Sequence, residues 1–385
     1  MARATDLATV TPDLSTPRLD RLVDDGHLLG YSVAVRSGDG STRVATRGVA
    51  VPEGGRAVDP STSYRLASLS KPVAGLLAAG LLAEGALAPE DPIRRWVPEL
   101  DGVRVLLDRA GPLEETEPVA RPVTVHDLLT MTSGLGIRFD DTPLSRAMGE
   151  AGVHPGPVPT TLEAEPFLAR LGELPLAFQP GEGWAYHTST DVLSVVLARA
   201  SGVPLDRLLA ERLTGPLDAP SLSFSTPDPQ RRAPSYLDLG DGWEPIEPDG
   251  PADPAMLTLS CGLWGTATDT ARVLGELVRP TVLPADAVEV VRTPALTAAQ
   301  VEAARPFVPE GYSFGHQVCV ATADDPQGPR AGSAGWSGGT GTLGIADPAA
   351  DRTVVLLTNR GLDGPLGTAA FDAALADLWS DVRDG

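Results

Sequence analysis

The stretch Leu66-Ala67-Ser68-Leu69-Ser70-Lys71-Pro72 decides how this chain is interpreted. It leads from turn residues into an apolar run, and this pattern predicts a helix over residues 68–84. Proline is tolerated near a helix N-terminus, so Pro72 places the start of the helix close to Ser68. Because residues three apart share a helix face, the Lys71 amine can approach the Ser68 hydroxyl.

Lys71 is the only lysine in a chain of 385 residues that carries 30 basic side chains. Arginine cannot lose its proton near neutral pH, whereas a buried lysine can, and a neutral lysine can activate a serine as a nucleophile. The alternative is a serine that caps the helix beside a surface lysine that has survived by chance. The isolated lysine at a helix start favours the catalytic interpretation.

Composition restricts the class of protein further. The net charge of −21 argues against nucleic acid and anionic membrane surfaces as partners. The first thirty residues lack the pattern of a signal peptide, and no apolar run approaches the ~18 residues of a membrane span, so we expect a cytoplasmic protein.

Cys261 and Cys319 are expected to be small buried residues. No metal or organic cofactor is expected, because no two of the five histidines have metal-ligand spacing, and most of them are expected at the surface or core edge.

The two ends of the chain have strand patterns, and the middle is mostly helical. Alternating Val-rich runs at 31–36 and 41–51 predict a hairpin, and a helix is expected at 368–382. Further helices are predicted at 125–131, 161–171 and 191–201, and strands at 316–321, 341–346 and 353–358. We expect one α/β (α+β) domain over 1–385, in which an α/β lobe from 18–67 and 255–385 holds a helical lobe from 68–254. A site between the lobes would follow.

Several motifs together resemble the serine β-lactamase and penicillin-binding-protein superfamily, most closely class C β-lactamases and family VIII esterases. Ser68 and Lys71 match its S-x-x-K motif. The later matches are the segment TVHDLLTMTSGL at 124–135, PGEGWAYHT at 180–188, SGVPL at 201–205, GLWGTATD at 262–269 and GWSGG at 335–339. The resemblance covers residues 20–382. It implies a β-lactamase/transpeptidase-like fold, with an antiparallel sheet flanked by helices and an inserted helical lobe.

By this resemblance, Ser68 attacks an acyl carbonyl, and Lys71 and Tyr186 share the proton transfers. A phenol near an ammonium group can also have a lowered pKa, which would make Tyr186 a useful base. The family often has Asn two positions after this tyrosine, and this chain has Thr188, which can donate only one hydrogen bond to a substrate.

The third motif is Trp336-Ser337-Gly338, in place of the K-T-G or H-x-G seen in other members. These three residues are expected to line the substrate site, and the N–H groups of Ser68 and Gly339 to form the oxyanion hole. Because Trp336 replaces a cation, the resemblance favours neutral acyl donors over anionic β-lactams. The W-x-G form is found among family VIII esterases.

A rival nucleophile is Ser337, because residues 335–339 also fit the G-x-S-x-G elbow of α/β-hydrolases. The elbow needs a following helix and a later histidine. The segment after Ser337 has a strand pattern, and the last histidine, His316, precedes it. We therefore favour Ser68.

The predicted function is a serine hydrolase that works through an acyl-enzyme, either an esterase or amidase with water as acceptor or a transacylase with an alcohol or amine. The expected partner is a small acyl substrate, and the oligomeric state stays open. The alternatives are a β-lactamase or D-alanyl-D-alanine carboxypeptidase and, as another class, a non-catalytic binding protein with the same fold.

Overall fold

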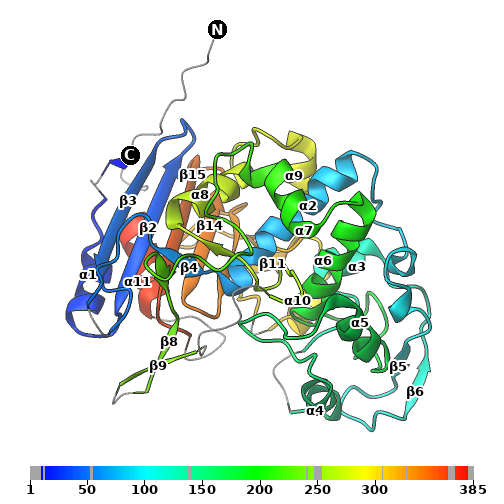
Figure 1. Cartoon of the computed structure of the whole chain (residues 1–385). Coiled ribbons are helices and arrows are strands. Elements are labelled where there is room, and N and C mark those ends of the chain that lie inside the picture. Colours follow the sequence, from blue (N-terminus) through cyan, green and yellow to red (C-terminus); the bar gives the residue numbers. More distant parts are fainter. Residues whose placement is uncertain are drawn as a thin grey trace.

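The computed structural model describes residues 10–11, 14–52, 55–137, 141–239, 242–246, 254–305, 307–326, 328–362 and 369–379. Its main sheet has eight strands in the order β1-β3-β2-β15-β14-β13-β12-β11 (Figure 1). In that order the strands are Val10–Thr11, Thr42–Gly48, Gly30–Ser37, Arg352–Thr358, Thr342–Asp347, Ala334–Gly338, Cys319–Ala321 and Tyr312–Phe314. All neighbours pair antiparallel except β1 and β3.

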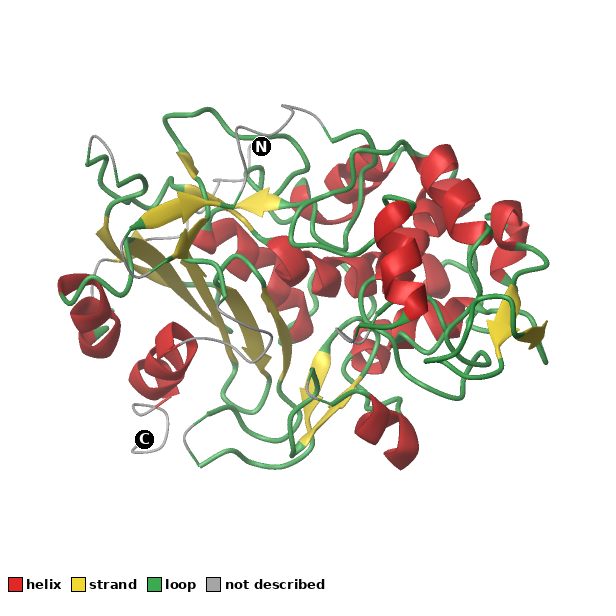
Figure 2. Cartoon of the chain, turned by 90° about the horizontal axis from the view of Figure 1, so that it is seen from below, coloured by secondary structure: helices red, strands yellow, loops and turns green. Residues whose placement is uncertain are grey.

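The two ends of the chain meet in the middle of the sheet, where β15 pairs with β2 and Val354 lies opposite Val35. Successive side chains of a strand point to opposite faces. Val35 and Val354 therefore pack toward α1 (Pro17–Asp24) and α11 (Ala369–Trp379), while their neighbours Ala34 and Val355 join the main core on the other face. Helix α8 (Ala267–Leu274) packs on that second face, so the sheet lies between two helical layers (Figure 2).

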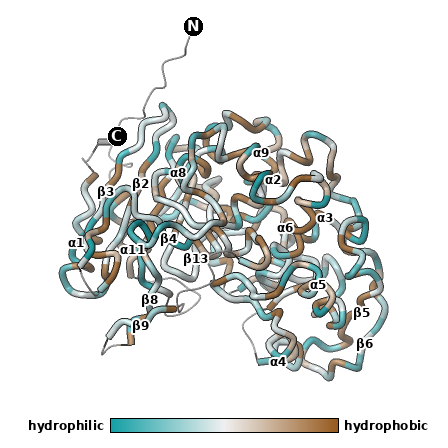
Figure 3. Tube along the Cα trace, in the orientation of Figure 1, coloured by the Kyte–Doolittle hydropathy of each residue, from teal (hydrophilic) through white to brown (hydrophobic). Residues whose placement is uncertain are grey.

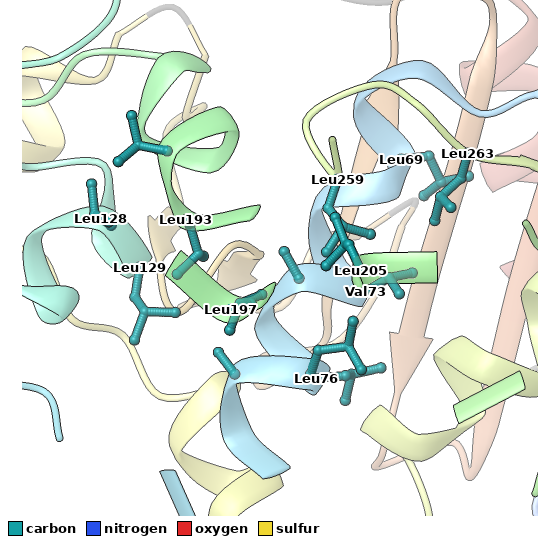
Figure 4. Packing of buried hydrophobic residues seen from close by; sticks show 14 of the residues in the cluster. Leu69, Val73, Leu76, Leu128, Leu129, Leu193, Leu197, Leu205, Leu259 and Leu263 are labelled. Atoms are coloured by element: carbon teal, nitrogen blue, oxygen red, sulfur yellow. The ribbon is translucent and has the colours of Figure 1, made fainter. Parts of the chain in front are cut away.

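Helix α2 (Lys71–Ala83) is the buried centre of the molecule. Its sequence is apolar on every side, as expected for a helix that is enclosed on all sides. Leu69, Val73 and Leu76 belong to the main core, in which α6 (Thr188–Ser201) contacts both α2 and α3 (Val125–Thr130) (Figure 4). Helix α2 is mostly hydrophobic in the coloured trace, whereas α6 is mixed (Figure 3).

The remaining elements are short. The other helices are α4 Pro143–Glu150, α5 Ala164–Gly172, α7 Leu205–Leu209, α9 Ala285–Val291 and α10 Ala298–Ala303. Tight 3₁₀ turns span Ala67–Ser70, Ile93–Arg95, Pro98–Leu100 and Gly275–Leu277, and a π-helical turn spans Ala210–Thr214. Small sheets are formed by β10 Trp264–Gly265, β4 Ser63–Arg65 and β7 Arg232–Ala233, by β5 Arg104–Leu106 and β6 Thr116–Pro118, and by β8 Tyr236–Asp238 and β9 Trp243–Pro245. Among the described residues, no helix has the length and apolar character needed to span a bilayer.

The predicted hairpin is confirmed as β2 and β3, and the predicted late strands as β12, β14 and β15. The predicted helix at 368–382 is confirmed as α11, with residues 368 and 380–382 outside the described part of the chain. Helices α1, α4, α9 and α10 and strand β11 were not predicted, because each is too short to show a clear period.

Candidate active site

Ser68 lies in a tight turn between strand β4 and helix α2. The 3₁₀ turn Ala67–Ser70 continues directly into α2, which begins at Lys71. The preceding residue, Ala67, has φ +46°, a left-handed conformation that is uncommon for a residue with a Cβ and is often found at functional sites. Ser68 is 7% exposed, and the packing around the turn fixes its position.

The Lys71 amine is completely buried and has three polar neighbours. Its Nζ lies 2.9 Å from Ser68 Oγ, 2.7 Å from the carbonyl oxygen of Ser260 and 3.4 Å from Nδ1 of His187. Burial lowers the pKa of Lys71 from 10.5 to about 7, and this effect outweighs the opposing influence of Cys261 and Asp191. A neutral amine in contact with the serine hydroxyl is therefore accessible near pH 7.

Tyr186 contributes a phenol and a ring to the same site. Its hydroxyl accepts a hydrogen bond of 2.7 Å from Nε1 of Trp336, and Lys71 Nζ lies 4.7 Å from the centre of its ring. The expectation of a lowered pKa is wrong, because burial raises the pKa of Tyr186 and outweighs the lowering from hydrogen bonds with Ser68 and Trp336. Tyr186 therefore stays protonated near neutral pH, with its hydroxyl at the nucleophile.

Strand β13 approaches the Ser68 turn at Gly338. A Cβ on Gly338 would lie 2.2 Å from the carbonyl oxygen of Leu66 and 3.2 Å from the amide nitrogen of Leu69, so only glycine allows this approach. The end of the strand is thereby held beside the turn. Gly339 directly follows the last residue of β13, so it lies next to this contact.

Two of the predicted substrate-site residues, Ser337 and Thr188, make no hydrogen bond with the Ser68 side chain among the described residues. Ser337 lies on the opposite face of β13 from Trp336 and pairs with Leu343, which packs in the α1 and α11 cluster. It also lies within a strand, not on a strand-to-helix turn, so the elbow arrangement is absent there. Thr188 is completely buried at the first position of α6, and its hydroxyl has no hydrogen-bond partner among the described residues.

Trp336 is 8% exposed and belongs to an aromatic cluster behind the site. Its ring packs edge-on against Phe314 at 5.4 Å between centroids, and its N–H is directed to Tyr186. Phe307 stacks on Tyr186, with 4.5 Å between the ring centroids. The cluster fixes the tyrosine ring and provides an apolar wall at the site.

Three residues around the lysine were not predicted from the sequence. The carbonyl of Ser260 accepts a hydrogen bond from Lys71. His187 lies next to the Lys71 amine, and Asp191 lies next to the far side of the His187 ring. His27, His126 and His154 are exposed, as expected for most of the histidines, whereas His187, at 4% exposed, and His316 are buried. The position of His187 directly after Tyr186 was a usable signal. The approach of Ser260 was not predictable, because 189 positions separate it from the lysine.

This fold and this grouping of serine, buried lysine and tyrosine define a serine enzyme of the acyl-transfer type. The chain belongs to the Beta-lactamase family, whose pattern matches residues 17–378. It is an enzyme of the esterase and acyltransferase kind within that family, with a β-lactamase/transpeptidase-like fold.

Three comparisons illustrate the relationship. The chain is 33% identical to the esterase EstB of Burkholderia gladioli, over 93% of this chain and 95% of the esterase. It is 35% identical to an uncharacterised protein of Mycobacterium tuberculosis, over 82% of each chain. Among solved structures, it is similar to EstCE1, a hydrolase with promiscuous acyltransferase activity, with a TM-score of 0.79 and 23% identity over 96% of this chain and 97% of that one.

Proposed function

We propose that this protein is an esterase that transfers small neutral acyl groups through a covalent ester on Ser68. The observation that carries the proposal is the buried Lys71 amine, which lies 2.9 Å from Ser68 Oγ and has a pKa of about 7. A base with a pKa near the working pH combines a useful neutral fraction with enough basicity to take a proton.

In the first half of the reaction, Ser68 Oγ bonds to the acyl carbon, and its proton moves to Lys71 Nζ. The carbonyl oxygen becomes an oxyanion that the N–H groups of Ser68 and Gly339 stabilise. The bond to the leaving alkoxide then breaks. Tyr186, whose phenol is protonated, gives its proton to that oxygen and is reprotonated by the Lys71 ammonium.

In the second half, an acceptor attacks the acyl-enzyme, and the same groups move the protons in reverse. Water as acceptor gives an acid product, and an alcohol gives a new ester. The similarity to EstB supports esterase activity, and the acyltransferase activity of EstCE1 supports an alcohol as a second acceptor. A cytoplasmic location is part of this proposal.

The apolar wall supports a neutral substrate. Trp336 occupies the motif position where related enzymes carry a cation, and its N–H is used by Tyr186. Phe307 and Phe314 extend the apolar surface. A carboxylate on the substrate would lose its hydration there without gaining a charged partner from position 336. This disfavours a β-lactamase or a carboxypeptidase acting on cell-wall peptides.

Labelling with a fluorophosphonate probe, followed by peptide mass spectrometry, tests the proposal. We expect the label on Ser68 and none on Ser337. Labelling of Ser337, or an active protein that is not labelled at Ser68, would refute the mechanism. A chromogenic cephalosporin assayed beside a short-chain nitrophenyl ester tests the substrate class, and we expect turnover of the ester to be the faster.

A further inference from the structure

Lys71 Nζ has three polar neighbours, and three is the number of hydrogen bonds that a neutral amine can form. A neutral amine has two N–H bonds and one lone pair, and it can take a proton from Ser68 only if the lone pair faces Oγ. The carbonyl of Ser260 can only accept, so it takes one N–H at 2.7 Å. The second N–H needs another acceptor, and His187 Nδ1 lies 3.4 Å away.

We propose that His187 is a positioning residue, whose Nδ1 accepts a hydrogen bond from Lys71 and so holds the lone pair of the amine toward Ser68. This inference rests on the proposed acylation of Ser68.

The backbone at His187 supports the assignment. Its φ of +83° and ψ of −67°, together with a hydrogen bond of 3.2 Å from the N–H of Thr188 to the carbonyl of Tyr186, define a γ-turn of the rare, strained kind. In regular structure, neighbouring side chains point in different directions. The turn lets both Tyr186 and His187 flank Lys71, one through its ring face and one through its nitrogen. Strain of this kind is often retained at functional sites.

The surroundings of Nε2 are consistent with a His187 tautomer in which Nε2 carries the proton and Nδ1 is the acceptor. Its Nε2 lies 3.7 Å from Oδ2 of Asp191, which favours a proton on Nε2 and leaves Nδ1 free to accept. Asp191 itself is held by the hydroxyls of Thr258 and Ser260, at 2.7 and 2.5 Å. Burial and the nearby Lys71 lower the pKa of His187 well below its usual range, so the ring is neutral and able to accept at neutral pH.

The test uses the full chain with His187→Gly. Glycine adopts a positive φ without strain, so this variant removes the acceptor and keeps the turn. We expect fluorophosphonate labelling of Ser68 at pH 7 to slow by up to about 100-fold, as when a catalytic group is misplaced by about 1 Å. Added imidazole should fill the space and restore part of the rate. Pyrrole, which fills the same space but offers no nitrogen acceptor, should not restore the rate, whereas it would do so if the role of His187 were only structural.

The pH profile of labelling is a second readout. Water that enters the space left by the ring should raise the pKa of Lys71, because burial is what lowers it, and the acid limb of the profile should move to higher pH. Imidazole should move it back. The titratable groups that face Lys71 or His187 in the intact site are Tyr186, Asp191, Cys261 and His154.

His187→Asn is the matched variant, because Asn tolerates positive φ and keeps an acceptor. We expect it to be labelled faster than His187→Gly. The inference is overturned if His187→Gly is labelled as fast as the wild type, or if it is slow but neither imidazole nor Asn improves the rate. Absence of Ser68 labelling in the wild type would refute the proposed function instead.

Discussion

Lys71 combines complete burial with contact to the nucleophile, and this combination separates it from the arginines of the chain. Arginine in its place would remain charged and could not take a proton from Ser68. We expect Lys71→Arg and the neutral Lys71→Met each to reduce the rate of Ser68 labelling by about 10²- to 10⁴-fold, the usual range for a general base. A fully active Lys71→Arg variant with a normal fold would contradict this role.

The same residue predicts a pH dependence of stability. The folded pKa of Lys71 is about 7 and its ordinary value is 10.5, so between these values the unfolded chain holds a proton on this amine that the folded chain does not. The contribution of Lys71 to stability therefore rises as the pH increases from 7 to 10.5. Its size is on the order of a few kcal/mol. Urea denaturation of wild type and Lys71→Met across this window measures it, and the rise should be absent from the variant.

Tyr186 is predicted to matter most when the leaving group needs a proton. Tyr186→Phe keeps the ring beside Lys71 but removes the hydroxyl. We expect kcat for simple alkyl esters to fall by about 10²-fold or more, as for loss of a general acid. Turnover of nitrophenyl esters should fall much less, because nitrophenolate leaves without protonation. Equal losses for both ester classes would argue against a proton donor.

At the scale of elements, the approach of β13 to the Ser68 turn depends on Gly338. Gly338→Ala forces a Cβ against backbone atoms of Leu66 and Leu69 and should cost about 1–3 kcal/mol of stability, as overpacking does. Gly339→Ala is the matched control, because its Cβ would meet only Pro157 Cβ at an ordinary 3.5 Å. Thermal melts and Ser68 labelling should therefore show a larger loss for Gly338→Ala. The reverse order would mean that this contact does not set the position of the strand.

At the scale of the whole molecule, the terminal helices are tied together by Asp377. Its carboxylate accepts the backbone N–H groups of Arg18 and Leu19, at 2.8 and 3.2 Å, and so caps α1 from α11. We expect Asp377→Ala to lower the unfolding free energy by about 0.5–2 kcal/mol, the usual effect of losing a helix cap. The labelling rate of the folded protein should not change. The exposed Asp372 on the same helix provides the control. An equal loss of unfolding free energy in Asp372→Ala would contradict the capping role of Asp377.

The sequence by itself determined the turn that carries Ser68, the sheet built from both ends of the chain and the order of the motifs. These features follow from local spacing and periodicity. The S-x-x-K spacing predicted the contact of Lys71 with Ser68, since one helical turn sets that distance. The buried His316 was not distinguishable from the surface histidines, whereas the buried His187 was marked by its position directly after Tyr186. Short helices such as α9 and α10 were not predictable, because they have too few residues to show a helical period.

Only the tertiary structure decided the chemical environment of the site. The carbonyl of Ser260 and the ring of His187 reach Lys71 from segments far from it in sequence, and burial by all of them together lowers the pKa of the lysine and raises that of Tyr186. Desolvation depends on every atom that excludes water around a group, so no local pattern encodes it. The local sequence pattern therefore pointed to the residues that are proposed to react, and the packing of distant segments sets their protonation.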